Sequence, residues 1–137
     1  MTTPLYCLLG MVGWTLLLVL AIGAVRSAHV LRGEKQANEF PGGTQHGGDA
    51  YWRLNRAHLN ATENLALFAA VVLTGTLAGV TTPLFSTLAQ AYLAARVVQS
   101  IVHVSSGSAR AVLLRFSAFA VQVCCVAAMG VEIVRHA

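Results

Sequence analysis

Four apolar stretches, each close to the length that a helix needs to cross a bilayer, divide this chain of 137 residues. They lie at residues 5–25, 65–80, 84–104 and 111–134. A helix crosses about 30 Å of hydrocarbon with about 20 apolar residues. The chain is 10% charged, whereas a soluble domain carries about 25%. We therefore predict an all-α integral membrane protein: a single domain, residues 1–137, folded as a four-helix antiparallel bundle.

The connecting segments set the bounds of the predicted helices, which we place at residues 5–25, 51–80, 83–104 and 110–134. The second helix begins upstream of its apolar run, because that run is short on its own. Residues 26–50 are polar and contain Pro-Gly-Gly, which predicts a long loop. The other two connections are short turns, so the helices that they join are antiparallel neighbours. A cleaved signal peptide is an alternative for the first stretch, but no basic residue precedes that stretch and it is long for such a segment.

Basic residues gather at one end of the predicted bundle. The segment 26–56 holds Arg26, Arg32, Lys35, Arg53 and Arg56. Two more arginines follow the last turn, whereas the N-terminal residues and the turn at 81–83 have none. By the positive-inside rule, the long loop and the last turn face the cytoplasm and both termini lie on the opposite side. The net charge of +4 then reflects orientation and lipid contact, and not nucleic-acid binding.

A polar segment, RLNRAHLNATEN at residues 53–64, leads directly into the second apolar stretch. On a helix, five of its side chains fall within an arc of about 100°: Arg53, Arg56, Asn60, Glu63 and Asn64. His58 and Asn55 point elsewhere. Two cations, a carboxylate and amide groups on one face suit a small zwitterionic ligand.

The third predicted helix carries a second polar stripe: Tyr92, Arg96, Gln99 and His103, at helical spacing. An arginine within the membrane costs about 2.5–3.5 kcal/mol on insertion scales, so it faces the bundle interior or a polar cavity. Two alternatives stay open. Arg96 could pair with Glu63 only to hold the helices together, and His103 could be a helix-end histidine bonded to a neighbour.

Two arginines near the start of the fourth helix have different predicted roles. Arg110 lies at the same membrane level as Arg56 and His103, so the charged candidates converge on one cytoplasmic-half site. Arg115 lies roughly 140° around the helix from Arg110. We predict that Arg115 is a snorkelling anchor that points away from the site.

The string Arg56-Ala57-His58-Leu59-Asn60-x-x-Glu63-Asn64 resembles the second-helix signature of the MAPEG family. These are the membrane-associated proteins in eicosanoid and glutathione metabolism, which include the microsomal glutathione transferases. The string from Ala95 to Gln99 resembles the third-helix pattern of the family, and Arg110 resembles the arginine that contacts the glutathione sulfur. The resemblance covers essentially the whole chain.

The resemblance implies a homotrimeric glutathione transferase or peroxidase of the bacterial type, in the inner membrane, with its site facing the cytoplasm. Glutathione would be the co-substrate, with no metal, and a lipophilic second substrate would come from the bilayer. The glutathione-binding residues implied are Arg26, Arg53, Arg56, Asn60, Glu63, Asn64, Arg96, Gln99 and His103. Glu63 would hold the γ-glutamyl ammonium, and Arg110 would be the catalytic residue that stabilises the thiolate. Gln99 and His103 stand where family members often carry tyrosines.

Two other function classes remain as alternatives. A non-catalytic family member would bind glutathione or lipid as a scaffold. A small proton-coupled exporter would need an ionisable residue deep in a helix, and the first apolar stretch has none.

Other motifs predict packing and not chemistry. The three cysteines, which we predict to be small buried hydrophobes without CxxC spacing, are Cys7, Cys124 and Cys125. The GxxxG pattern from Gly75 to Gly79 predicts close helix packing.

Overall fold

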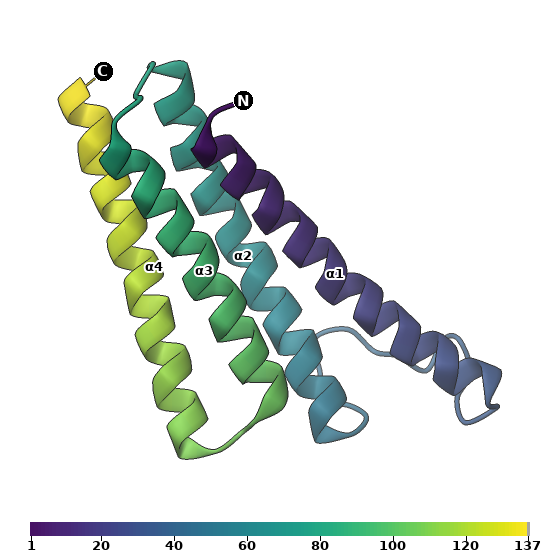
Figure 1. The fold of residues 1–137 in the computed structure, drawn as a ribbon. Coiled ribbons are helices and arrows are strands. Elements are labelled where there is room, and N and C mark those ends of the chain that lie inside the picture. Colours follow the sequence, from purple (N-terminus) through teal and green to yellow (C-terminus); the bar gives the residue numbers. More distant parts are fainter. Residues whose placement is uncertain (137) are drawn as a thin grey trace.

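The computed structural model describes residues 1–136, and within them the chain forms four long helices and no strand. The helices are α1 (Thr3–Leu31), α2 (Asp49–Leu77), α3 (Pro83–Ser105) and α4 (Ala109–His136). Successive helices run antiparallel (Figure 1). The start of α1 and the end of α4 lie at the same end of the bundle as the α2–α3 turn, and the long loop and the α3–α4 turn lie at the other (Figure 1). The predicted all-α four-helix class is confirmed.

The predicted helix bounds need correction at several ends. α1 continues to Leu31 instead of ending at residue 25, so the loop is 32–48 and not 26–50. Hydrophobicity marked the predicted end, but the backbone stops being helical only where Gly33 adopts a φ of 70°. α2 likewise ends at Leu77 and not at residue 80, because Gly79 adopts a φ of 72°.

The start of α3 is fixed by a cap. Thr82 precedes the helix, and its Oγ1 accepts a hydrogen bond from the backbone N–H of Phe85 at 3.1 Å. Pro83 occupies the first helical position, where its missing N–H has no cost. The same Thr82 hydroxyl donates to the buried carboxylate of Glu132 on α4 at 2.8 Å, so one side chain ties the α3 start to α4.

α2 and α3 are the two central helices of the bundle, since each contacts the other three. α1 packs against α2 and α3, α4 packs against α3 and α2, and within residues 1–136 α1 and α4 do not meet. The rings of Phe68 and Tyr92 stack with centroids 4.0 Å apart. At Gly75 the α2 backbone approaches Phe85 so closely that a Cβ there would lie 2.4 Å from the ring. The close packing predicted from the GxxxG pattern therefore occurs inside the protomer, at Gly75.

The outward faces of the helices are rich in large apolar side chains, as expected where the solvent is lipid. By length and composition α1 and α4 could each cross a bilayer.

The prediction for the cysteines is wrong at one position. Cys7 and Cys125 are buried, but Cys124 is exposed on α4.

Residues spaced three and four apart form a buried face on α4 and an exposed face on α2. The buried face of α4 is formed by Ala111, Ala118, Gln122, Cys125, Met129 and Glu132. α2 has an exposed stripe with the same spacing: Arg56, Leu59, Glu63, Ala66, Ala70, Leu73 and Leu77. This is the spacing with which helices pack side by side. We call the second set the exposed α2 stripe.

Candidate functional site

A cavity of about 290 Å³ lies among α2, α3 and α4 and brings together residues far apart in the sequence. We call it the α2–α4 cavity. Its polar residues are Arg56 and Asn60 from α2, Gln99 and His103 from α3, and Arg115 from α4. Its apolar residues are Val112, Phe116 and Phe119 from α4. Arg56, Asn60, Gln99 and His103 were all predicted from the sequence to belong to one site, and they do line one cavity.

Two hydrogen bonds fix the α3 side of this cavity. The Asn60 amide nitrogen lies 3.5 Å from Nδ1 of His103. An amide nitrogen can only donate, so Nδ1 is the acceptor in this contact. The amide nitrogen of Gln122 donates to Oε1 of Gln99 at 3.0 Å. Gln122 was not singled out in the sequence, although it is a polar residue in the middle of an apolar run on the buried face of α4.

The α2–α4 cavity is positively charged. Arg56 and Arg115 line it, no carboxylate does, and His103 lies within the electrostatic reach of Arg115, Arg56 and Arg53. A cavity with fixed cations and no acid favours an anionic ligand, and its phenylalanine wall favours an apolar one beside it.

The prediction for Arg115 is wrong. Arg115 lines the cavity with His103 and Gln99 instead of pointing away from the site. Its position is in phase with the buried face of α4, four residues after Ala111 and three before Ala118. Arg110, by contrast, is exposed and is not part of the cavity lining.

Arg96 is buried on α3, next to the cavity-lining Gln99 in the polar stripe. Its side chain is 1% exposed, and Nε and Nη2 have no hydrogen-bond partner among the described residues. Glu63 is exposed, and within residues 1–136 it forms no ion pair with Arg96. The alternative in which these two side chains pair to hold α2 on α3 is therefore wrong for a single protomer.

Two other predicted residues make contacts within the protomer. Nε of Arg53 donates to the carbonyl oxygen of Val104 at 3.1 Å, which satisfies a carbonyl in the last turn of α3. The amide nitrogen of Asn64 donates to the carbonyl oxygen of Asn60 at 2.9 Å, and the Asn64 carbonyl accepts from the Tyr92 hydroxyl at 3.1 Å.

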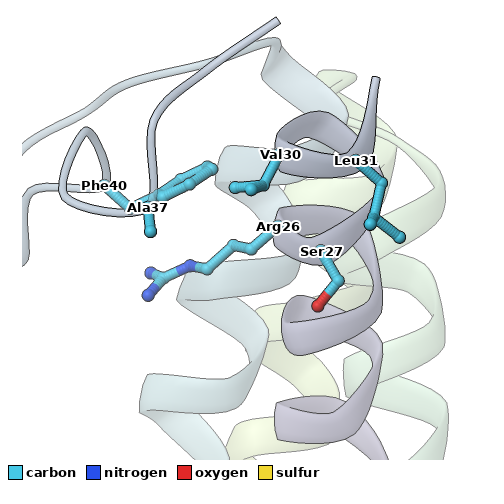
Figure 2. A pocket seen from close by; sticks show the side chains of 6 residues that line it. All are labelled: Arg26, Ser27, Val30, Leu31, Ala37 and Phe40. Carbon is cyan, nitrogen blue, oxygen red and sulfur yellow. The ribbon is translucent and has the colours of Figure 1, made fainter. Parts of the chain in front are cut away.

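Arg26 lies away from the α2–α4 cavity, at the end of the bundle that the long loop covers. Figure 2 shows its side chain extending from α1 past Ala37 and Phe40 of the loop. These residues line a hollow of about 450 Å³. Nε of Arg26 donates to the Tyr51 hydroxyl at 2.7 Å, and the guanidinium carbon lies 5.4 Å from the centroid of the Phe40 ring.

A third hollow, of about 370 Å³, connects this region to α2. Arg26 and Arg56 both line it, together with Trp52, Asn55 and His58. We call it the loop hollow. Asn55 and His58 do point away from the predicted ligand face, but they meet Arg26 and Arg56 here. Sequence spacing could not predict this hollow, because the conformation of the long loop determines which residues the loop covers.

Among residues 1–136, no group of histidine, cysteine and acidic side chains is arranged to hold a metal ion.

Comparison with known proteins gives one clear result. The model of the MAPEG family matches residues 4–135, nearly the whole chain. No curated protein matches it. Four helices, an apolar exterior and a family match of this extent agree with one another. The chain therefore belongs to the MAPEG family, and it is a membrane protein of glutathione-related or eicosanoid metabolism.

Proposed function

We propose that this protein is a glutathione-dependent membrane transferase. The thiolate of the bound glutathione attacks the second substrate and also serves to reduce hydroperoxides. The observation that supports it most is the α2–α4 cavity, in which Arg56, Asn60, Gln99 and His103 share one space with an aromatic wall. Family membership supplies glutathione as the expected co-substrate.

The chemistry of glutathione suits these residues. It has two carboxylates, one ammonium and one thiol. Arginine forks bind carboxylates, and we assign this role to Arg56, Arg53, Arg26 and Arg96. We assign the ammonium to Glu63, and further hydrogen bonds to Asn60 and Asn64. The buried guanidinium of Arg96 supports its place in the set, because Nε and Nη2 have no partner among the described residues and buried N–H groups require an acceptor.

Catalysis requires the thiolate. A free thiol titrates near about 8.5, so a minor fraction is ionised at neutral pH. A nearby guanidinium stabilises the thiolate, and we assign Arg110 to that role. The sulfur then attacks an electrophilic carbon of a lipophilic substrate. A carbon–sulfur bond forms, and the leaving group departs with its electron pair while the thiol proton passes to solvent.

The exposed α2 stripe supports an assembly of copies of this chain, which we propose to be a homotrimer. Arg56 and Glu63 lie on the outside of the protomer within a helix that also carries exposed Leu73 and Leu77. Charged side chains are costly against lipid, so this face requires a cover. A second copy packed along the stripe would supply one, and it would bring an exposed residue such as Arg110 to the edge of a neighbour's site.

Conjugation of glutathione to a chlorodinitrobenzene electrophile by the purified protein in detergent tests the proposal. We expect turnover, and we expect Arg56→Met to weaken glutathione binding about tenfold to a hundredfold, the value of one charge-assisted hydrogen bond of about 1.5–3 kcal/mol. Arg32→Met is the matched control, because Arg32 is exposed in the α1 cap.

Three results are distinguishable. Turnover that depends on Arg56 supports the transferase. Binding of glutathione without turnover of this electrophile or of a hydroperoxide supports the scaffold alternative. Absence of glutathione binding overturns the proposal.

A further inference from the structure

We infer that Arg115 is a further ligand-binding residue of the site and that its guanidinium holds the sulfur end of glutathione. The inference rests on the proposed function and adds to it a residue outside the polar segment and stripe from which the site was predicted.

The position of Arg115 on α4 is the first argument. It lines the cavity and falls in the same repeat as Ala111, Ala118 and Gln122, all of which are buried. A residue in phase with the packed face cannot leave the bundle without rotating the helix. Arg115 is therefore held in the cavity by its place in the helix and not by a chance side-chain conformation.

The absence of a counter-charge is the second argument. None of the ion pairs among residues 1–136 includes Arg115, and no acidic residue lines the cavity. The half-buried guanidinium of Arg115 shares the cavity with His103 and with a second arginine, Arg56, and with no carboxylate. Such a cation is stabilised when the cavity holds an anion.

The position of the apolar wall decides which anionic group of glutathione lies at Arg115. Phe116 and Phe119, which are close to Arg115 on the same helix, form the side of the cavity that suits a lipophilic electrophile. The sulfur must meet that electrophile, so the thiolate belongs where the cations border the phenylalanines. The carboxylates of glutathione belong near Arg56, on the neighbouring helix.

The α3 side of the cavity gives a reason why an arginine is needed. Gln99 and His103 form the α3 side of the cavity. Here Oε1 of Gln99 is bonded to Gln122, and Nδ1 of His103 is bonded to Asn60. Both side chains are thus oriented by protein partners, and Arg115 offers a charged donor across from them.

The test uses the full-length protein in phosphatidylcholine vesicles, with Arg115→Gln and Arg115→Lys variants. The ultraviolet absorbance of bound thiolate is followed against pH, and binding of S-methylglutathione is measured alongside. We expect Arg115→Gln to raise the pKa of the bound thiol by about one to two units. The rate at neutral pH should fall about tenfold to a hundredfold and recover at high pH.

Binding of S-methylglutathione, which has no thiol to ionise, should stay unchanged in Arg115→Gln. Arg115→Lys keeps the charge and should restore part of the shift, which also covers the case in which the Gln variant does not fold. Arg32→Gln should match the wild type.

Two results overturn the inference alone. An unchanged thiol pKa and rate in Arg115→Gln would leave Arg115 as a lipid-phosphate anchor. A loss of S-methylglutathione binding as large as the loss of rate would make Arg115 a carboxylate ligand. A wild-type protein that binds no glutathione overturns the proposed function, and the inference with it.

Discussion

The arginines of this protein differ in whether their guanidinium groups already have a hydrogen-bond or ion-pair partner. Arg53 donates to the end of α3, and Arg26 donates to the Tyr51 hydroxyl. Arg96 has two nitrogens without a partner, and Arg115 has no ion pair in the described part of the chain. The last two therefore have the most to gain from an anionic ligand, because a buried donor without a partner costs about 1–3 kcal/mol.

Removal of Arg110 tests the thiolate role that the family resemblance assigns to it. We expect Arg110→Ala to lower the rate about tenfold to a hundredfold, the worth of one charge-assisted hydrogen bond, with little change in glutathione affinity. Steady-state rates and the pH titration of the bound thiol measure both effects. The proper control is Arg135→Ala, at the opposite end of α4, since Arg115 lies in the cavity. An unchanged rate together with an unchanged thiol titration would remove Arg110 from the mechanism.

Helical periodicity explains which site residues the sequence could reveal. Arg56 and Asn60 lie on one face of one helix, and Gln99 and His103 on one face of another, so spacing alone grouped each pair. Arg115 was misplaced because its direction was judged relative to Arg110, which is itself off the packed face. The loop hollow could not be predicted at all, because it depends on how residues 32–48 fold back over α2.

At the scale of the helices, the residues that end a helix differ from the residues that set how closely two helices pack. The apolar runs predicted the number and direction of the helices, whereas Gly33 and Gly79 set where α1 and α2 stop. Between α2 and α3, the contact is closest at Gly75, which faces the ring of Phe85. A glycine inside a helix is normally unfavourable, so its presence here reflects the space that the ring needs.

Substitution of this glycine tests that contact. Gly75→Ala places a methyl group where the Phe85 ring lies, so we expect a loss of about 1–3 kcal/mol in the free energy of unfolding. Denaturation in mixed detergent micelles measures it. Gly13→Ala in α1 is the control, because nothing lies within 4 Å of a Cβ there, and the change should be neutral or favourable. Equal stability of the two variants would mean that Gly75 is not needed for the α2–α3 contact.

At the scale of the whole molecule, one protomer leaves part of its polar surface uncovered. The exposed α2 stripe combines Arg56 and Glu63 with small residues, Ala66 and Ala70, that permit close helix approach. Two members of the proposed ligand set, Arg56 and Glu63, thus lie on the exposed face of α2 and not in the protomer's own core. In the proposed assembly, a neighbouring copy would complete the site.

The mass of the detergent-purified protein tests the assembly. We expect three copies of the 14.4 kDa chain, and Ala66→Trp should reduce that mass because its ring fills the space between α2 helices. Val98→Trp, on an exposed position of α3, is the matched control and should leave the trimer intact. Glu63→Gln should keep the trimer but weaken glutathione binding. A monomer that binds glutathione with wild-type affinity would contradict the proposed assembly.

Arg56 belongs to two spaces at once, the α2–α4 cavity on one side and the loop hollow on the other. The N–H donors that Arg56 turns toward one space are lost to the other, so the two spaces are linked through it. Any molecule that draws Arg56 into the loop hollow weakens what the cavity holds, and by thermodynamic reciprocity the occupant of the cavity weakens that molecule by the same factor. A molecule bound at the long loop would then adjust the occupancy of the α2–α4 cavity without a change in any helix.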